Sequence, residues 1–452
     1  MSGSLIQKYN VPGPRYTSYP TVPYWDSTTF DSKKWKTSVK CAFDENQKEL
    51  SLYIHLPFCE SLCTFCGCHK RITKRHEVET PYIESLLKEW QLYVNLFKDN
   101  PVVKEIHLGG GTPTFFSPEN LKELIDGIFK IAKRGQDVEF SFEGHPNNTK
   151  RDHLQVLFDL GFRRVSYGVQ DYNPRVQKAI NRIQPFENVE RVTEQSREIG
   201  YTSVSHDLIF GLPFQRKEHI LDNIVKTAKL LPDRIAFYSY AHVPWIKGNG
   251  QRGFDEKDIP NGDEKRELYE FGKKLLADAG YEEIGMDHFA LKTDSMYIAM
   301  KQGSLHRNFM GYTMQNTSLM IGLGVSSISD SWSAFAQNEK DINTYKELVN
   351  QGEIPVFKGH VLSNHDLILR KHILNLMCQF QTSWQDNAMK FAELDEVIDS
   401  LQELENDGLL HFINQGIQVT DLGRAFIRNI CMAFDVYLRK NKPETQLFSL
   451  TV

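Results

Sequence analysis

Apolar runs alternate with amphipathic segments from residue 51 to about residue 280. The runs are rich in Val, Ile, Phe and Tyr, which is typical of buried parallel strands, and the segments between them have helical spacing. The six runs are Leu52–Pro57, Lys104–Leu108, Val138–Glu143, Arg164–Gln170, Thr202–Ile209 and Ile235–His242. Two helices have a clear predicted start, because Thr80 and Ser117 are capping residues that are each followed by Pro. The pattern predicts six βα units and a parallel sheet, either doubly wound or curled into a barrel.

Glycine and polar residues gather at the carboxyl ends of these runs. In chain order they are a cysteine-rich loop, Gly109–Gly111, Glu143, Gln170, Asp207 and the pair Ala241 and His242. In parallel α/β folds this edge of the sheet carries the active site. Because all the strands contribute there, we expect one site shared around a barrel. An acidic residue at a strand end can also simply cap the next helix.

The flanking segments divide the chain into three expected parts. These are an N-terminal arm over 1–50, the barrel and its extension over 51–355, and a mostly helical domain over 356–452. In the last part, helices are followed by the apolar run Leu409–Ile413, the turn Asn414-Gln415-Gly416, a returning strand over 417–420 and a helix from Thr420. This order resembles a winged helix. No dense basic stripe accompanies it, so an accessory or packing domain is favoured over DNA binding.

Composition and charge exclude several classes of partner. With 452 residues, of which 40% are hydrophobic, the chain can bury a substantial core. Its 53 Lys and Arg against 58 Asp and Glu give a net charge of −5, which does not favour nucleic acid or an anionic membrane. The first residues lack the pattern of a signal peptide, and no apolar stretch is long enough to span a membrane. We therefore expect a cytoplasmic protein with reduced thiols.

Four of the seven cysteines lie within ten residues, directly after the first predicted strand. Cys59, Cys63 and Cys66 have the spacing C-x-x-x-C-x-x-C, and Cys68 follows two residues later. Three thiolates on one loop can ligate three irons of a [4Fe–4S] cluster and leave the fourth open for chemistry. A structural zinc site prefers paired C-x-x-C hooks, and disulfides need a secretory context. The spacing favours a cluster but leaves zinc and unliganded thiols open.

Longer motifs resemble a known family. The cysteine spacing, Phe65 before the third cysteine and the glycines after the second strand resemble the radical S-adenosylmethionine (SAM) enzymes. Segments similar to the oxygen-independent coproporphyrinogen III oxidases are GPRYTSYPT (13–21), YIHLPFC (53–59), CTFCGC (63–68), GGGTPT (109–114), YGVQD (167–171), DLIFGLP (207–213), GMDHFA (285–290), HRNFMGY (306–312) and RNICM (428–432). The resemblance covers nearly the whole chain. It implies a partial (βα)6 barrel with an N-terminal arm and a helical C-terminal domain.

The resemblance implies a radical oxidation of a tetrapyrrole. Cys59, Cys63 and Cys66 would ligate one [4Fe–4S] cluster, and one electron would cleave a bound SAM to a 5′-deoxyadenosyl radical. That radical takes a hydrogen from a propionate of coproporphyrinogen III, and loss of CO2 and one electron leaves a vinyl group. Reaction of two propionates gives protoporphyrinogen IX, in haem biosynthesis without oxygen. A flavodoxin- or ferredoxin-type electron donor and a monomer are also implied.

The resemblance also assigns residues to the cofactors. Cys68 matches a cysteine that lies near the cluster without ligating it. The other positions matched to cofactor contacts are Tyr53, Phe65, Gly110, Gly111, Thr112, Glu143, Gln170, Arg182, Asp207 and Ala241. The family can place a second SAM beside the first, and Ile209 and Ile328 match positions near it. Met310 stands where some relatives have Gln and cannot donate the same hydrogen bond, although its sulfur can pack against a cofactor.

The substrate has four carboxylates, and the N-terminal motif offers cationic and hydroxyl groups for them. Arg15 and Tyr16 lie in this motif among prolines that stiffen the chain. With His306 and Arg307 they are the predicted substrate-binding residues. The alternative is an arm that only packs across the barrel.

Other functions within the superfamily are the main alternatives. A branch of haem-binding chaperones keeps the three-cysteine motif but typically lacks the fourth cysteine and the N-terminal motif, both of which this chain has. Another radical enzyme acting on a tetrapyrrole would share the cofactor residues, because a fold does not determine the substrate. The oxidase activity is therefore the expected function.

Overall fold

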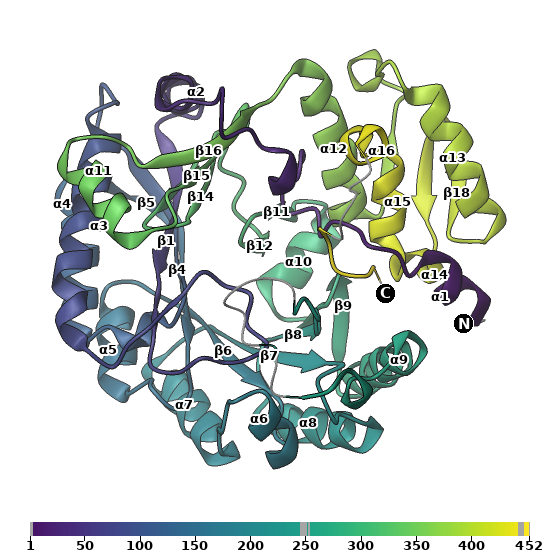
Figure 1. The fold of residues 1–452 in the computed structure, drawn as a ribbon, viewed down its shortest axis with the longest axis horizontal. Helices are drawn as coiled ribbons and strands as arrows, with labels where there is room; N and C mark the ends of the chain where they lie inside the picture. Colours follow the sequence, from purple (N-terminus) through teal and green to yellow (C-terminus); the bar gives the residue numbers. More distant parts are fainter. Residues whose placement is uncertain (1–2, 245–250, 252–253, 442–446, 452) are drawn as a thin grey trace.

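A curved, twelve-stranded sheet forms the centre of the computed structural model, which describes residues 3–244, 251, 254–441 and 447–451. The strand order is β16-β15-β14-β13-β1-β4-β5-β6-β7-β8-β10-β9. From β13 to β8 in this order, all neighbouring strands are parallel. They curl into a partial barrel whose outer side is covered by helices (Figure 1). The predicted fold class, a partial barrel with a mostly helical C-terminal part, is confirmed.

The six predicted strands are all present. They are β1 (Glu49–Leu56), β4 (Val102–Gly110), β5 (Lys133–Gly144), β6 (Arg164–Gln170), β7 (Ser203–Phe210) and β8 (Arg234–Ser239). The last strand ends earlier than predicted, because its partner β7 ends at Phe210, which pairs with Ser239. Ala241 and His242 therefore lie in the loop beyond β8 and not at the end of the strand.

Amphipathic helices cover the outer side of the barrel. They are α3 (Glu79–Val94), α4 (Pro118–Lys130), α5 (Arg151–Asp159), α6 (Pro174–Ala179), α7 (Phe186–Ile199), α8 (Lys217–Leu230) and α9 (Gly262–Asp278). The start of α4 is as predicted: the Ser117 hydroxyl accepts a hydrogen bond from the Asn120 backbone N–H. The predicted start of α3 is wrong. A 3-10 turn, η2 (His76–Val78), leads directly into Glu79, where the helix begins. Pro81 therefore lies in the first turn, where backbone N–H groups have no partner within the helix and proline is tolerated.

Antiparallel strands extend the sheet at both edges. One extension contains β13 (Met320–Leu323), β14 (Ile328–Asp330), β15 (Ala334–Asn338) and β16 (Val356–Val361), and the other contains β10 (His288–Leu291) and β9 (Tyr281–Gly285). Because β16 pairs with β15, residues 356–361 belong to the sheet and not to the C-terminal part. Helix α2 (Ser32–Glu45), expected in the arm, packs on this extension and contributes Trp35 and Val39 to the main core.

The remaining elements connect the barrel or form the C-terminal part. The connecting elements are η1 (Val22–Tyr24), β2 (Phe58–Cys59), β3 (Arg71–Ile72), η3 (Pro113–Phe115), η4 (Glu256–Asp258), α10 (Ser295–Gln302), β11 (His306–Asn308), β12 (Gly311–Thr313) and α11 (Ile342–Asn350). The C-terminal part contains α12 (Asn364–Gln379), β17 (Gln381–Ser383), η5 (Asn387–Met389), α13 (Leu394–Asn406), β18 (Leu410–Ile413), β19 (Gly416–Val419), α14 (Asp421–Arg424), α15 (Ile427–Ala433) and α16 (Val436–Lys440). The predicted hairpin is present as β18–β19, and the helix expected from Thr420 is divided into α14 and α15.

The N-terminal arm packs against the C-terminal part (Figure 1). It begins with α1 (Gly3–Tyr9), and its Tyr9, Tyr16 and Tyr19 belong to the C-terminal hydrophobic core. Arg428 of α15 donates hydrogen bonds to the backbone carbonyls of Gly13 and Pro14. The first segment of the arm, from α1 to Tyr19, is therefore a structural component of the C-terminal part, whereas α2 belongs to the core of the barrel side.

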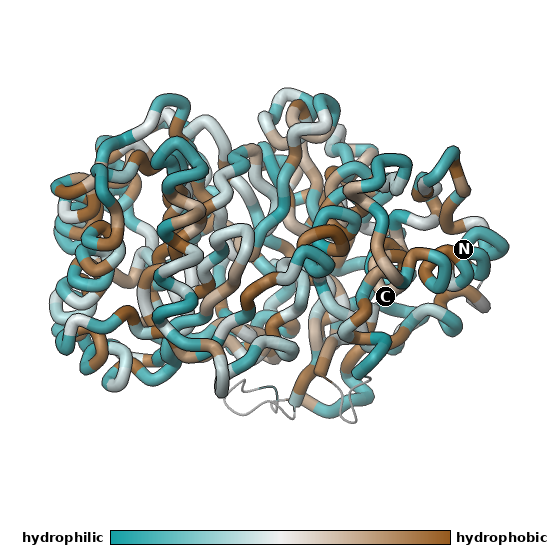
Figure 2. The backbone as a smooth tube through the Cα atoms, turned by 90° about the horizontal axis from the view of Figure 1, so that it is seen from above, coloured by the Kyte–Doolittle hydropathy of each residue, from teal (hydrophilic) through white to brown (hydrophobic). Residues whose placement is uncertain are grey.

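Polar surface surrounds these cores. Seen from above in Figure 2, hydrophilic residues dominate many of the outermost turns. Among the described residues, no helix is long and apolar enough to cross a membrane.

A buried carboxyl group joins α3 to the sheet extension. Glu89 is fully buried and accepts hydrogen bonds from the Gly324 N–H (2.8 Å), the Asn338 amide (2.6 Å) and the Tyr345 hydroxyl (2.6 Å). Burial raises its pKa from 4.5 to about 7, although these three hydrogen bonds oppose the shift. The folded protein therefore holds a proton on Glu89 that the unfolded chain releases at lower pH.

This raised pKa predicts a loss of stability with rising pH. Between pH 4.5 and 7 the folded state binds more protons at Glu89 than the unfolded state, so the contribution of this group falls by about 3 kcal/mol across that window. Glu89→Gln should remove this loss. The difference between the melting temperature of the variant and that of the wild type should therefore shift in favour of the variant as the pH is raised from 5 to 8. The exposed Glu84→Gln on the same helix is the control. Parallel pH profiles for all three proteins would contradict the expectation.

Candidate functional site

A cavity of about 520 Å³ lies at the carboxyl ends of the parallel strands. Most of the predicted cofactor residues line it, from five different strand ends and their loops. These are Cys59, Cys63, Phe65, Cys66, Cys68, Gly110, Gly111, Thr112, Glu143, Gln170, Arg182, Asp207 and Ile209. The structure thus brings together residues that are up to 150 positions apart in the chain.

The cysteine loop is held by backbone hydrogen bonds on both sides. Strand β2, which ends at Cys59, pairs in parallel with β3, so the two ends of the loop lie side by side. On the other side, the Thr64 N–H donates to the Ile180 carbonyl (3.0 Å), and the Asn181 amide donates to the Leu62 carbonyl (2.8 Å). The loop is therefore held on one side by the strand pair and on the other by the residues that follow α6 (Pro174–Ala179).

The thiols lie in a positively charged environment. A hydrogen bond from Cys68, the nearby Lys70 ammonium and Arg182 lower the pKa of Cys66. Arg182 also donates to the Cys63 sulfur (3.5 Å). Burial raises the pKa of Cys59 to about 11, although the Thr112 hydroxyl at 3.3 Å opposes the shift.

This thiol arrangement fits a cluster. Cations close to cysteine sulfur favour the thiolate form that binds metal. Among the described residues, no three His, Cys, Asp or Glu side chains gather around one point as ligands of a single ion would. Thiolates that each hold a different iron do not need to converge.

The glycine run brings β4 into backbone contact with the cysteine loop. The Gly111 and Thr112 N–H groups donate to the carbonyls of Leu56 (2.8 Å) and Phe58 (3.0 Å). A Cβ at Gly111 would come within 2.7 Å of the Pro57 carbonyl oxygen, and Gly110 has φ = +110°. Both positions therefore require glycine. The run is explained by this close approach and by exposure of its backbone to the cavity.

Charged groups of both signs face the cavity. Burial would raise the pKa of Glu143, but His107 and the Gly110 N–H (3.3 Å) lower it overall, so this group is a carboxylate. Burial raises the pKa of Asp207 to about 7, although Ser166 donates a hydrogen bond to it at 2.9 Å. The Arg182 guanidinium lines the same cavity, as do Lys70, Lys74 and Glu60, so the cavity offers several cations beside Glu143 and Asp207, two carboxyl groups of different proton affinity.

Three of the predicted cofactor residues do not line this cavity. Tyr53 is buried below it, where its hydroxyl lies 3.0 Å from His55 Nδ1 and its ring contacts Phe309. Ile328 lies in an apolar cluster with Trp25, against which Phe309 packs. Ala241 lies beyond β8, where its carbonyl accepts a hydrogen bond from the Gln251 amide.

The predicted substrate residues lie in different surroundings in the structure. Arg15 pairs with Asp287 (3.1 Å), and its carbonyl accepts a hydrogen bond from Arg307 (3.4 Å). Tyr16 does not face a cavity: it is 2% exposed, and its hydroxyl donates to Asp435 (3.1 Å) inside the C-terminal core. Burial lowers the pKa of His306 to about 4, so it is a neutral residue at neutral pH.

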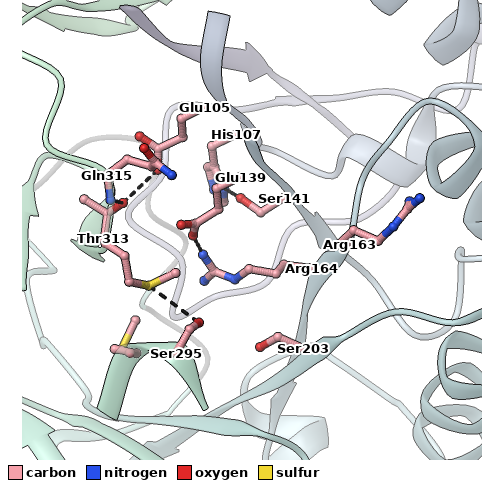
Figure 3. A network of polar contacts seen from close by, with 12 residues as sticks. Glu105, His107, Glu139, Ser141, Arg163, Arg164, Ser203, Ser295, Thr313 and Gln315 are labelled. Atoms are coloured by element: carbon pink, nitrogen blue, oxygen red, sulfur yellow. Dashed lines mark hydrogen bonds and ion pairs between the residues drawn. The ribbon is translucent and has the colours of Figure 1, made fainter. Parts of the chain in front are cut away.

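The polar interior of the barrel is the main feature that the sequence prediction missed. Polar side chains of β4 to β8 line a second cavity of about 130 Å³: Glu105, His107, Glu139, Ser141, Arg164, Ser166, Ser203, Ser205, Arg234 and Tyr238. Figure 3 shows Arg164 paired with Glu139 and Thr313 beside Glu105. The signal was present, because every second residue of these strands is polar. The sequence prediction rests on the Val, Ile, Phe and Tyr content of these strands and does not use this alternation.

Three residues connect the two cavities. Glu143, Asp207 and Tyr238 line both the cysteine cavity and the interior cavity. Met310, the position where some relatives have Gln, lines the interior cavity near Tyr238. A ligand in the cysteine cavity would therefore lie directly above a buried polar space.

Comparisons with known proteins identify the family of the chain. The profile of the Radical SAM superfamily matches residues 53–225, and that of the HemN C-terminal domain matches residues 362–426. The oxygen-independent coproporphyrinogen III oxidase of Helicobacter pylori (strain J99) is 40% identical over 445 residues, 96% of each chain. The protein of the same name from Escherichia coli (strain K12) is 38% identical over 454 residues, 99% of this chain and 98% of that one.

A solved structure supports the same relationship. Coproporphyrinogen III oxidase (HemN) from Escherichia coli, described as a radical SAM enzyme, matches with a TM-score of 0.88 at 36% identity. The match covers 96% of this chain and 98% of that one. Radical SAM enzymes use a [4Fe–4S] cluster and SAM, and the thiols and charged groups of the cysteine cavity fit both. This chain belongs to the family of oxygen-independent coproporphyrinogen III oxidases.

Proposed function

We propose that this protein converts coproporphyrinogen III to protoporphyrinogen IX without oxygen, by oxidative decarboxylation of two propionate side chains. The observation that supports this most directly is the single cavity in which Cys59, Cys63 and Cys66 face Arg182, Glu143 and Asp207. The relatives that carry this activity in their names match nearly the whole chain, including the arm and the C-terminal part.

The three cysteines would hold one cluster, and the charged groups would orient SAM. When bound, the cluster and SAM supply a one-electron cleavage that yields a hydrogen-abstracting radical. Arg182 can pair with the SAM carboxylate, because a guanidinium binds a carboxylate through two parallel hydrogen bonds. Glu143 is ionised and suits the SAM ammonium, and Asp207 suits the ribose hydroxyls. The thiol of Cys68 lies beside Cys66 without being needed as a ligand.

We also propose a place for a second SAM next to the first. Ile209 lines the cysteine cavity and pairs with Tyr238, which lines both cavities, and Met310 lines the interior cavity. The side chain of Met310 offers a polarisable sulfur in place of an amide. A second molecule here would be held by packing more than by a hydrogen bond from residue 310.

Arg307 is proposed as the group that receives a substrate carboxylate. Its side chain is 4% exposed, and among the described residues no atom accepts a hydrogen bond from its Nε or Nη1. A buried guanidinium with two unused donors is costly unless an anion meets it. Its guanidinium lies over the ring of Tyr312, which lines the interior cavity. Arg15 of the arm lies next to Arg307, because its carbonyl accepts a hydrogen bond from that residue. The guanidinium of Arg15 forms an ion pair with Asp287.

In each half-reaction the substrate carbon loses a hydrogen atom, its carboxylate leaves as CO2, and one electron passes to an acceptor. One electron must also enter from outside for each SAM that is cleaved. We propose that this electron comes from a small flavodoxin- or ferredoxin-type protein. We further propose that the enzyme acts as a monomer.

The direct test is turnover of the reconstituted protein without oxygen. Dithionite, SAM and coproporphyrinogen III should give 5′-deoxyadenosine and two successive mass losses, each of CO2 and two hydrogens. Cleavage of SAM with an unchanged tetrapyrrole would indicate a radical SAM enzyme that acts on a different substrate. A loaded cluster without cleavage, together with tight haem binding, would contradict the proposal.

The assignment of the thiols predicts a specific pattern of metal loss. Cys63→Ala should lose most of the bound iron and sulfide, because three ligands are the minimum for the proposed cluster. Cys68→Ala should keep both, because its thiol is not a ligand. Cys41→Ala, at an exposed thiol on α2, is the control. Iron and sulfide analysis with visible absorption checks all three, and equal metal loss in Cys63→Ala and Cys68→Ala would contradict the assignment.

The unused donors of Arg307 predict an effect on substrate binding. Arg307→Gln should raise the KM for coproporphyrinogen III on the order of 10-fold, because a hydrogen bond between charged groups is worth about 1.5–3 kcal/mol. Arg307→Lys should restore part of this loss. Substrate-independent cleavage of SAM should stay within about twofold of the wild type. A fall in both activities together would indicate a structural role.

A further inference from the structure

A basic segment is attached directly to the cysteine loop. Lys70-Arg71-Ile72-Thr73-Lys74-Arg75 has four cations in six residues. The Arg71 N–H donates to the Pro57 carbonyl (2.8 Å) and the Thr73 N–H to the Cys59 carbonyl (2.9 Å). Ile72 is the strand partner of Cys59. The segment is therefore fixed one strand spacing away from the first proposed iron ligand.

The side chains of this segment face solvent. Arg71, Lys74 and Arg75 are exposed, and no ion pair of the described residues includes any of them. Ile72 is 42% exposed. The acidic neighbours along the chain are Glu60 and Glu77, and Asp341 from another segment lies close enough to Arg71 for that guanidinium to lower its pKa. Four basic groups against these three acids still leave the surface positive, although the whole chain has a net charge of −5.

A second exposed aliphatic side chain lies at the mouth of the same cavity. Ile183 is 61% exposed and lines the cysteine cavity together with Lys74. A surface that combines exposed aliphatic groups with cations outside ion pairs is suited to bind an acidic protein. Lys70 is different, because it donates to the carbonyls of Cys66 (2.9 Å) and Cys68 (3.3 Å) and belongs to the loop itself.

We propose that the surface formed by Arg71, Ile72, Lys74, Arg75 and Ile183 is the docking site of an acidic one-electron carrier protein of the flavodoxin or ferredoxin type. This inference rests on the proposed function, because that reaction must be started by an electron from outside. Electron transfer slows steeply with distance, so the carrier must approach where the cysteine loop reaches the surface. Opposite charge steers such encounters, and redox partners typically bind through small interfaces.

The substrate is a second anion that this surface could attract. Two observations favour the carrier. Arg71, Ile72 and Arg75 line neither the cysteine cavity nor the interior cavity, so they face away from the proposed reaction space. A buried cation with unused donors, Arg307, is already available on the interior side.

Charge reversal at two positions outside both cavities tests the proposal. Arg71→Glu with Arg75→Glu changes the net charge by −4, and Lys33→Glu with Lys40→Glu on the exposed side of α2 is the control with the same change. The probe is a flavodoxin of negative net charge, kept reduced by its reductase. The holoenzyme is measured by binding of oxidised flavodoxin and by turnover with either flavodoxin or dithionite.

The proposal makes a joint prediction for binding and turnover. The Arg71/Arg75 variant should bind flavodoxin about 10-fold more weakly at low salt and lose most of the salt dependence that the wild type shows. Its KM for flavodoxin should rise in parallel, and its dithionite-driven turnover should stay within about twofold of the wild type. The α2 variant should resemble the wild type in all assays.

The other outcomes separate the two proposals. Unchanged flavodoxin binding in the Arg71/Arg75 variant, or an equal loss in the α2 variant, would overturn the docking site and leave the proposed function intact. A raised KM for coproporphyrinogen III with both reductants would show that the surface attracts the substrate, which also overturns it. Failure of the wild type to turn over with dithionite would instead contradict the proposed function.

Discussion

The site depends on one close approach between two pieces of backbone. The residues after β4 form hydrogen bonds with the residues that lead into the cysteine loop, as neighbouring strands of the sheet do. No side chain fits between Gly111 and Pro57. This contact places the thiols over the barrel opening. It also directs the Gly110 N–H toward Glu143, and this hydrogen bond helps to hold that carboxyl group ionised beside the thiols. Loop position, charge and cavity shape therefore all follow from one constraint.

The barrel below this contact is unusual in its interior. Closed (βα)8 barrels are filled by layers of branched aliphatic side chains, whereas this open barrel is lined by ionisable and hydroxyl groups. Several of its charges are paired, as in Arg164 with Glu139 and Arg234 with Asp294. Such pairs leave little net charge, and removing one partner would leave the other unpaired in a buried space. The interior is thus suited to hold polar ligands next to the proposed radical chemistry.

Much of the architecture was predictable from local patterns. The apolar runs identified six strands, Ser117 and Pro118 gave the start of α4, and the turn at Gln415 gave the hairpin of the C-terminal part. The site residues at strand ends could be expected to meet, because parallel strands share one edge. The start of α3 was missed, because a preceding 3-10 turn is not visible as a capping signal.

Other features depend on contacts between distant segments. Tyr16 was expected near the substrate but lies in a core formed by residues more than 350 positions away. The unused donors of Arg307 depend on what surrounds a single side chain, which no local pattern reports.

The packing of the arm has a further consequence for biosynthesis. The carbonyls of Gly13 and Pro14 bind Arg428, and the Gly13 N–H donates to the carbonyl of Ser449. The three arm tyrosines pack into a core formed by residues 369–436. During synthesis from the N-terminus they therefore stay exposed, and accessible to chaperones, until those residues have left the ribosome.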